Sequence, residues 1–251
     1  MCNSKTVPMA PAGYGSNVEG LHAVTAAAVA GRVERLWVEK GRMRRPEVAA
    51  ILDLVPREGI TPVDDVRSVA ETSAPQGVVA RCRPIRSLDL KELRERADAL
   101  MVLDHVEDPQ NLGAVARSVA AAGLGGIVVP GRRSAPLSAA AFKAAAGALE
   151  RVPVAIVSSI PDALSRLKDD GMWTVGLAAD APQSLFGLDL LTEPVAMVLG
   201  AEGSGLSRLT AERCDVLVSI PMAADTESLN ASVAAALAAY EVVRVRAAGR
   251  I

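Results

Sequence analysis

Two polar loops, each following an apolar run typical of a buried strand, hold most of the residues in this chain that could do chemistry. The first loop, 200–206, has the sequence GAEGSGL and places three glycines around a single carboxylate, Glu202. Its backbone can adopt positive φ angles and approach a ligand closely. The second loop delivers Ser228 and Asn230 to an Ala-rich segment, where the first turn of a helix leaves backbone amides without partners. The strands that the two loops follow are predicted at Val195–Leu199 and Val216–Ile220.

The spacing of the glycines in the first loop differs from that of dinucleotide-binding loops. Gly200, Gly203 and Gly205 do not follow the pattern G-x-G-x-x-G, and no ribose-binding acid follows them at the expected interval. A nicotinamide-dependent oxidoreductase is therefore the weakest functional hypothesis. A structural role stays open for each loop taken alone, because glycine-rich turns are common and Ser228 or Asn230 could simply cap a helix.

A third polar segment, 104–118 with the sequence DHVEDPQNLGAVARS, combines a turn with a helix that carries Asn111 and Arg117. An arginine on a helix is often an ordinary exposed side chain, although its planar guanidinium can also hold a phosphate. The two histidines offer no clear general base. His22 is expected to be half-buried in an apolar helix, and His105 follows a strand but is not a catalytic candidate.

Taken together, the three segments are far more specific than any one of them. The stretches 104–118, LGAEGSGLS at 199–207 and SIPMAADTESLNAS at 219–232 resemble, in order and spacing, the motifs of the SpoU (TrmH-like) RNA ribose 2'-O-methyltransferases of the knotted SPOUT superfamily. The resemblance covers Val18 to Arg246 and is closest to the bacterial 23S rRNA guanosine-2'-O-methyltransferases. It implies methyl transfer from S-adenosylmethionine to the ribose 2'-hydroxyl of a nucleotide, with a guanosine of 23S rRNA as the leading target.

The resemblance assigns roles to five residues. Arg117 matches the catalytic arginine of the family, and Asn111 matches its partner in the site. Glu202 is implied to order the site, while Ser228 and Asn230 shape the cofactor and ribose pocket. Because the pKa of arginine lies above about 12, an arginine is a poor general base in water. We therefore expect this arginine mainly to hold the substrate phosphate and polarise the 2'-oxygen.

The cofactor is expected in a bent form at the turns after Leu177, Leu199 and Ile220, which a deep trefoil knot would bring side by side. Two departures from the family motifs affect positioning: Ala120 replaces a frequent acid, and Ala223-Ala224 replaces a turn that more usually contains glycine. Seven residues are expected to hold S-adenosylmethionine, largely through backbone groups: Leu199, Gly200, Ala201, Gly203, Ile220, Met222 and Leu229.

The basic residues gather in the N-terminal part. The formal net charge of the chain is −2, whereas residues 1–96 contain 15 Lys and Arg against 12 Asp and Glu. Charge alone does not indicate a nucleic-acid binder, and a basic cluster is often only a solvated surface. Segments 18–24 and 76–81, however, resemble the two ends of the ribosomal-protein-like substrate-binding domain of these enzymes. We expect five residues to contact RNA phosphates: Lys40, Arg42, Arg44, Arg45 and Arg81.

Cysteine usage and hydropathy exclude several classes. Cys2, Cys82 and Cys214 are odd in number and widely separated, so neither a disulfide framework nor a metal site is predicted, and a reducing cytoplasmic location is favoured. No run approaches the ~18 apolar residues of a membrane span. The apolar stretch Leu21–Ala30 has no basic region before it and is not read as a signal peptide.

The pattern of elements predicts an α/β protein of two domains. We expect a flexible tail at 1–17, a small RNA-binding α/β domain at 18–83, a linker at 84–98 and a knotted methyltransferase domain at 99–251. Strands and helices alternate in the last part, which implies a parallel sheet with helices on both faces. The knot rests on the resemblance alone, because chains generally avoid knots. Elements predicted before the linker are helices Leu21–Ala30, Pro46–Leu54 and Val63–Glu71 and strands Arg35–Glu39 and Gly77–Cys82.

The long final helix, predicted at Ser228–Ala247, is too apolar to face water on all sides. Members of the resembled family generally act as dimers that complete the site in trans, so we expect a homodimer. The small residues available for close packing against a partner are Ala231, Ala234, Ala235, Ala238 and Ala239.

Two alternatives to the rRNA enzyme remain. A tRNA ribose 2'-O-methyltransferase is the nearer one, against which the N-terminal domain argues. A non-catalytic RNA-binding or ribosome-assembly factor with the same fold is the other, and it would have no need of all five site residues.

Overall fold

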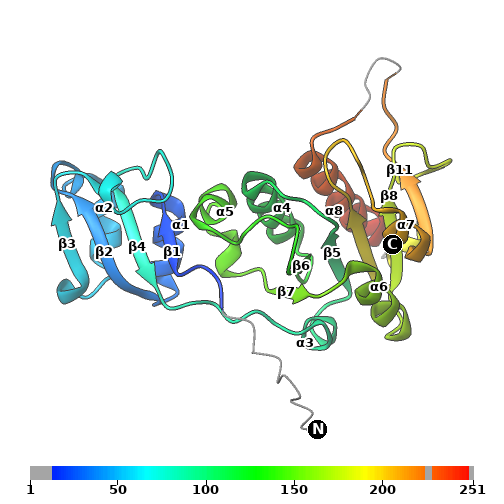
Figure 1. The fold of residues 1–251 in the computed structure, drawn as a ribbon, viewed down its shortest axis with the longest axis horizontal. Helices are drawn as coiled ribbons and strands as arrows, with labels where there is room; N and C mark the ends of the chain where they lie inside the picture. Colours follow the sequence, from blue (N-terminus) through cyan, green and yellow to red (C-terminus); the bar gives the residue numbers. More distant parts are fainter. Residues whose placement is uncertain (1–12, 224–227, 249–251) are drawn as a thin grey trace, which may run out of the picture.

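The computed structural model describes residues 13–223 and 228–248 and distributes them between two sheets. Figure 1 shows the smaller, N-terminal sheet at one end of an elongated molecule and the larger sheet toward the other end, with α1 and α5 at the junction. No described helix is long and apolar enough to cross a membrane. The predicted α/β class with a separate N-terminal unit is therefore confirmed.

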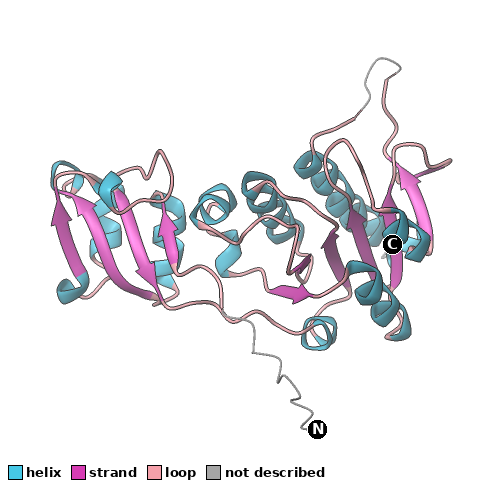
Figure 2. Cartoon of the chain, in the orientation of Figure 1, coloured by secondary structure: helices cyan, strands magenta, loops and turns pink. Residues whose placement is uncertain are grey.

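The N-terminal domain is a four-stranded sheet backed by α1 and α2 (Figure 2). The strand order is β1-β4-β2-β3, and β2 runs antiparallel to β4 and parallel to β3. Side chains of both helices pack on the inward-facing Leu36 and Val38 of β2, and burying such an aliphatic side chain contributes about 1.5–3 kcal/mol. The elements are β1 (Asn17–Glu19), α1 (Leu21–Val29), β2 (Val33–Glu39), α2 (Pro46–Leu52), β3 (Ile60–Val63) and β4 (Val78–Cys82).

The prediction of a helix at Val63–Glu71 was wrong. The strand β3 extends into this segment as far as Val63, and only a 3-10 turn at Val66–Ser68 follows. The carboxylate of Asp65 accepts a 2.8 Å hydrogen bond from the backbone N–H two residues on, a local bond that competes with helix formation. Pro62 fits in β3 because that strand lies at the edge of the sheet, where a proline breaks no ladder.

Part of the predicted tail is packed against the protein. Residues 1–12 lie outside the described part, but Tyr14 is buried and its backbone pairs with that of Ile85. The ring of Tyr14 lies 6.2 Å, centroid to centroid, from that of Phe142 in the second domain, within the range of favourable aromatic pairs. The expectation of a tail was therefore wrong for residues 13–17.

The segment between the domains, 84–98, is also packed. It contains α3 (Leu90–Glu95), close to the short helix expected at Leu90–Arg96, and Asp89 and Glu92 form a capping box at its start. Leucines of this helix are buried in a hydrophobic cluster of the second domain. The connection is thus held along its length rather than free.

The second domain is built on a seven-stranded sheet with the order β7-β6-β5-β10-β8-β11-β9. All neighbouring strands are parallel, as the alternating pattern predicted. The carboxyl ends of β8, β10 and β11 therefore meet at one edge, where ligands bind in such sheets. The strands are β5 (Ala99–Leu103), β6 (Ile127–Pro130), β7 (Val154–Val157), β8 (Trp173–Leu177), β9 (Gln183–Ser184), β10 (Val195–Leu199) and β11 (Val216–Ser219).

Helices cover both faces of this sheet. Residues of α4, α5 and α8 belong to a core that continues into the N-terminal domain, and residues of α3 and α6 belong to a second core. A Cβ on Gly113 of α4 would lie 2.3 Å from the carbonyl oxygen of Ala141 in α5, so these helices touch at their backbones. The helices are α4 (Pro109–Ala122), α5 (Ala139–Ala145), α6 (Ile160–Asp169), α7 (Arg208–Arg213) and α8 (Ala231–Ala248).

The final helix differs from its prediction in two respects. It starts at Ala231 rather than Ser228. Most of the alanines expected to face a partner are instead buried within the chain, where α8 packs on α4. Those buried in this way are Ala231, Ala235, Ala238 and Ala239.

A buried ion pair fixes the two domains to each other. Arg32, which follows α1, donates a 2.7 Å hydrogen bond from Nε to Oε2 of Glu150 and a second bond to Oε1. The side chains are only 11% and 4% exposed. Burial alone lowers the pKa of Arg32, but the hydrogen bonds to Glu150 outweigh this effect and raise it. The pair therefore stays charged, and removing one partner would leave the other charge buried.

Candidate active site

A pocket lies at the carboxyl ends of β8, β10 and β11. It contains about 770 Å³ of empty space, including the part open to solvent. The turns after Leu177, Leu199 and Ile220, which were expected to lie side by side, all contribute to its walls. The pocket is lined by each residue expected to hold the cofactor, namely Leu199, Gly200, Ala201, Gly203, Ile220, Met222 and Leu229.

The loop 200–205 folds back on itself beside this pocket. The backbone of Ala201 donates to Gly205 at 3.0 Å and accepts from it at 2.9 Å. Gly203 and Gly205 have φ angles of 77° and 66°, which glycine adopts without steric cost. A Cβ on Gly200 would lie 2.1 Å from the carbonyl carbon of Gly205. The closed shape of the loop therefore depends on glycine at these positions.

Three predicted site residues meet in one polar network. The carboxylate of Glu202 accepts hydrogen bonds from Nδ2 of Asn111 at 3.0 Å and from Nδ2 of Asn230 at 2.6 Å. Nδ2 of Asn230 also donates to Oδ1 of Asn111 at 3.0 Å. The first backbone amide of α8, that of Ala231, donates to the same carboxylate oxygen at 3.3 Å. A negative charge at a helix N-terminus is stabilised in this way.

Asn230 joins two tasks at the start of α8. Its Oδ1 accepts hydrogen bonds from the backbone N–H of Ser232 at 2.9 Å and from the Ser232 hydroxyl at 2.6 Å. The residue thus caps the helix while its Nδ2 points to the network. Ser228 lines the pocket and is exposed. Of the second motif departure, Ala223 is exposed and Ala224 lies outside the described residues.

Arg117 lies away from this network. A helix turns about 100° per residue, so a residue six positions after Asn111 lies about 240° around α4. Asn111 is buried beside Glu202, whereas Arg117 is exposed and lines a separate groove with His22 and Arg151. Within one chain, the structure brings together Asn111, Glu202 and Asn230 but not the predicted catalytic arginine.

The burial expected for His22 was wrong. His22 is the second residue of α1 and is exposed, while the following residues, Ala23 and Val24, face the core. The apolar neighbours that suggested burial therefore lie on the other side of the helix.

A second hollow adjoins the network and includes Arg133, which the sequence did not single out. It is lined by Asn111, Glu202, His105 and Arg133. The fully buried carboxylate of Asp104 accepts hydrogen bonds from the backbone N–H of Ser207 at 2.8 Å and from Nδ1 of His105 at 2.6 Å. A charged residue directly after the entirely apolar strand β5 is the signal by which this aspartate could have been found.

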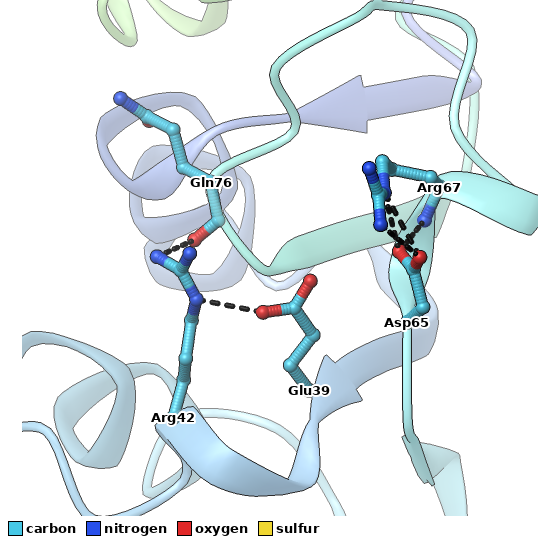
Figure 3. A network of polar contacts seen from close by, with 5 residues as sticks. All are labelled: Glu39, Arg42, Asp65, Arg67 and Gln76. Carbon is cyan, nitrogen blue, oxygen red and sulfur yellow. Dashed lines mark hydrogen bonds and ion pairs between the residues drawn. The ribbon is translucent and has the colours of Figure 1, made fainter.

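Some basic residues of the N-terminal domain contact carboxylates of the same domain, whereas others are exposed without such a contact in the described part. Figure 3 shows that Arg42 contacts the carboxylate of Glu39, at 2.7 Å, and the carbonyl of Gln76. Lys40 pairs with Asp64 at 2.9 Å. Arg44 and Arg45 are exposed and form no ion pair within the described part.

Arg81 occupies a different surface. It is exposed on β4, opposite Arg35 of β2, and donates a 3.3 Å hydrogen bond to Asn17 of β1. Glu19, in the same strand as Asn17, is fully buried, and its carboxylate accepts hydrogen bonds from the backbone of Glu71 and Thr72. This glutamate therefore holds a loop and does not face a ligand.

Thiol and metal chemistry have no support among the described residues. Burial raises the pKa of the Cys82 thiol to about 11 and that of Cys214 to about 12, so both stay protonated at neutral pH and are poor nucleophiles. Residues 13–223 and 228–248 contain no group of three or more His, Cys, Asp or Glu able to hold a metal ion.

Comparison with known proteins covers both domains. Residues 98–240 match the model of the SpoU rRNA Methylase family, and residues 17–88 match that for RNA 2'-O ribose methyltransferase substrate binding. The chain is 38% identical over 240 residues to the 23S rRNA (guanosine-2'-O-)-methyltransferase RlmB of Pseudomonas putida, with 91% of this chain and 96% of that protein covered. It is 41% identical to RlmB of Yersinia pestis, with 91% and 97% covered.

A solved structure shows the same architecture. The SpoU methyltransferase AviRb from Streptomyces viridochromogenes, in complex with the cofactor AdoMet, matches with a TM-score of 0.76 and 28% sequence identity, over 92% of this chain and 90% of that chain. The strand-end pocket, the two family models and relatives matched over nearly their full length lead to one conclusion: the chain belongs to the SpoU rRNA methylase family.

Proposed function

We propose that this protein transfers the methyl group of S-adenosylmethionine to the ribose 2'-hydroxyl of a guanosine in 23S rRNA. One observation carries the proposal: Asn111, Glu202 and Asn230 meet in a single network beside a pocket formed by strand ends. The relatives named as 23S rRNA guanosine-2'-O-methyltransferases support this reaction and this substrate. Such a substrate also implies a cytoplasmic location.

The residues of the pocket fit the cofactor. Leu177, Val218 and Leu229 provide apolar walls for a flat base, and the glycines of loop 200–205 allow close approach to backbone groups. When bound, S-adenosylmethionine supplies an activated methyl group on a sulfonium centre. The hydroxyl of Ser228 and backbone groups around Ala201 serve as the polar contacts that orient it.

Asn111, Glu202 and Asn230 position the target ribose. Glu202 is held by two side-chain amides and by the first amide of α8, so the geometry is set before RNA arrives. Transfer requires the 2'-oxygen in line with the methyl carbon, and correct positioning of two reactants supplies ~7–11 kcal/mol of the barrier. This rigid network therefore contributes mainly through orientation.

Arg117 holds the phosphate next to the target ribose and polarises the 2'-oxygen. Its guanidinium lies on the other flank of α4 from the network of its own chain. We propose that it serves the site of a second copy, so that a homodimer completes each site in trans.

An exposed apolar row on α8 supports the homodimer. Val233, Leu237, Tyr240 and Val243 follow each other at intervals of three or four residues and thus share one face, with exposed fractions of 47%, 36%, 52% and 37%. A second copy covers this row. Leu237→Asp is expected to give a monomer in light scattering at micromolar concentration, and a wild-type monomer under the same conditions would contradict the proposal.

We also propose that the chain is knotted at this site. β10 inserts between β5 and β8, and the segments that line the pocket come from three separate turns. These observations support the trefoil knot of the SPOUT class. Slow refolding from denaturant, with a phase that accelerates when the chain is cut before β11, is the expected signature.

The test of function is incubation with radiolabelled S-adenosylmethionine and unmethylated total RNA, followed by nuclease mapping of the labelled ribose. Wild type is compared with Arg117→Ala and with Arg166→Ala, a change at an exposed arginine of α6. We expect label on one 23S guanosine with wild type and Arg166→Ala, and none with Arg117→Ala. Label confined to tRNA would contradict the rRNA target, and cofactor binding without transfer to RNA or ribosomal subunits would indicate a non-catalytic factor.

A further inference from the structure

A groove between the two domains carries three basic side chains. It is lined by His22 of α1, Arg117 of α4 and Arg151, which follows the 3-10 turn Ala148–Glu150. All three residues are exposed. The other residues that line the groove are alanine, glycine, leucine, valine and proline, so no carboxylate is among its lining residues. A surface with this composition attracts anions.

The acid closest in sequence does not neutralise the groove. Glu150 precedes Arg151, but its side chain is only 4% exposed and both carboxylate oxygens accept hydrogen bonds from Arg32. Its charge is therefore compensated inside the domain interface. The guanidinium of Arg151 is left to solvent on the groove side.

Close packing fixes the width of the groove. Ala146 and Gly147 have φ angles of 49° and 89°. A Cβ on Gly147 would lie 2.7 Å from Cβ of Ala26 and 3.4 Å from the carbonyl oxygen of His22. The helix α1 therefore rests on this turn at backbone distance, at the junction visible in Figure 1. Together with the Arg32–Glu150 pair, this contact sets His22 at a defined position across from α4.

We propose that the groove binds the sugar-phosphate backbone of the RNA substrate, with Arg151 and His22 as phosphate-positioning residues beside Arg117. The inference rests on the proposed function and extends it to a surface outside the cofactor pocket. A guanidinium can grip a phosphate with two parallel N–H donors, and an imidazole N–H can donate one more. Because the groove takes residues from both domains, RNA bound there touches both, and the N-terminal domain helps to place the target ribose.

The test measures RNA binding by Arg151→Gln, His22→Gln and the double variant in the full-length protein. The probe is a transcribed 23S rRNA fragment, titrated without cofactor over a range of salt concentrations. Loss of the Arg151 guanidinium from one phosphate is expected to make the slope of log affinity against log salt shallower by about one. Loss of the His22 N–H is expected to weaken RNA binding with little change in that slope. The control is Arg166→Gln, an exposed arginine on α6 at the opposite face of the sheet, and its slope should equal that of wild type.

Kinetic measurements distinguish a role in positioning RNA from a general effect on folding. The double variant is expected to raise the KM for RNA by about tenfold, as when a charge-assisted bond is lost, while cofactor affinity stays within about twofold, a range that corresponds to less than one lost hydrogen bond. Arg151→Lys, which keeps the charge, should regain most of the salt slope.

Two results would overturn the inference: a wild-type salt slope in Arg151→Gln, or a raised KM that follows a loss of thermal stability with no change in slope. Failure of the proposed function has a different signature. A wild type without methyl transfer but with a salt slope that depends on Arg151 would refute the reaction and leave the groove intact.

Discussion

The pocket at the strand ends and the groove between the domains differ in how they are built. The pocket depends on backbone: Gly200, which leaves no room for a Cβ, two glycines with positive φ, a helix N-terminus and a carboxylate held by three donors. The groove depends on the exposed side chains of Arg117, Arg151 and His22, and no carboxylate is among the residues that line it. Backbone suits a small cofactor that must be oriented to a fraction of an ångström. Exposed cations suit a large polyanion, whose binding is dominated by phosphate contacts.

The difference also concerns what holds each region together. The pocket lies at the ends of strands of one sheet, whereas the groove includes His22 only while the two domains keep their relative position through Arg32 and Glu150. A substitution in the pocket should therefore leave RNA binding measurable, and a substitution in the groove should leave cofactor binding measurable. The following predictions use this separation, from the largest expected effect to the smallest.

Replacing Arg117 should lower the rate of methyl transfer without changing cofactor affinity. Arg117→Ala is expected to lower the rate of methyl transfer by about 10³-fold, comparable to the loss of a charge-stabilising donor in other enzymes. Arg117→Lys should recover little of this activity, because an ammonium cannot form a planar fork. Single-turnover transfer and calorimetric cofactor binding are the measurements. Near-normal turnover of Arg117→Lys would contradict the assigned role.

Breaking the ion pair between Arg32 and Glu150 should weaken RNA binding at the groove and leave cofactor binding in the pocket unchanged. Glu150→Gln leaves Arg32 charged in a buried position, so the free energy of unfolding is expected to fall by about 3 kcal/mol. RNA affinity should fall with it, whereas cofactor affinity at a temperature below the transition should not change. The measurement combines denaturant unfolding with both titrations. A loss of cofactor affinity equal to that for RNA would show that the two regions are not separable.

Adding one methyl group to the loop 200–205 should weaken cofactor binding and leave RNA binding unchanged. In Gly200→Ala the new Cβ has no room beside Gly205, so the loop must open and cofactor affinity is expected to fall by about 100-fold, equivalent to two or three lost hydrogen bonds. Gly131→Ala, at a glycine without a positive φ where a Cβ would meet its nearest neighbour at 3.5 Å, serves as a control for stability. RNA binding by Gly200→Ala should equal that of wild type, and a parallel loss would contradict the comparison.

The smallest effect is expected among the arginines of the N-terminal domain. Arg42 already contacts Glu39 and Gln76, whereas Arg45 is exposed. Arg45→Gln should weaken RNA binding about threefold. Arg42→Gln should weaken it less, because Arg42 must first give up its contacts with Glu39 and Gln76, which costs up to about 1 kcal/mol for a partly exposed ion pair. Filter binding at two salt concentrations is sufficient. An equal loss for both variants would show that the ion pair opens when RNA binds.

The sequence predicted the parallel sheet and most of its strands because buried β-strands and amphipathic helices leave distinct periodic patterns. It failed at Val63–Glu71, where the local bond of Asp65 and a proline in an edge strand override the apparent helical spacing. The start of α8 was placed too early because Asn230 acts as the cap and not as part of the helix. Such errors arise where side chain–backbone bonds decide the outcome.

The candidate site was only partly readable. The motifs contained Asn111, Glu202 and Asn230, which the fold assembles, but a linear pattern does not show that Arg117 points to the other flank of its helix. The groove residues His22 and Arg151 belong to segments 129 residues apart and share no motif. Only the docking of one domain on the other brings them to the same surface.

The position of β10 has a consequence for how the protein is made. This strand pairs with β5, which precedes it by almost a hundred residues, and with β8 on its other side. During synthesis, β5 and β8 therefore have no neighbour between them until residue 199 has left the ribosome. The N-terminal sheet, complete by residue 82, can fold long before that point. Because long-range parallel pairings form slowly, the half-made second domain exposes strand edges while the strands of the N-terminal sheet have all been synthesised.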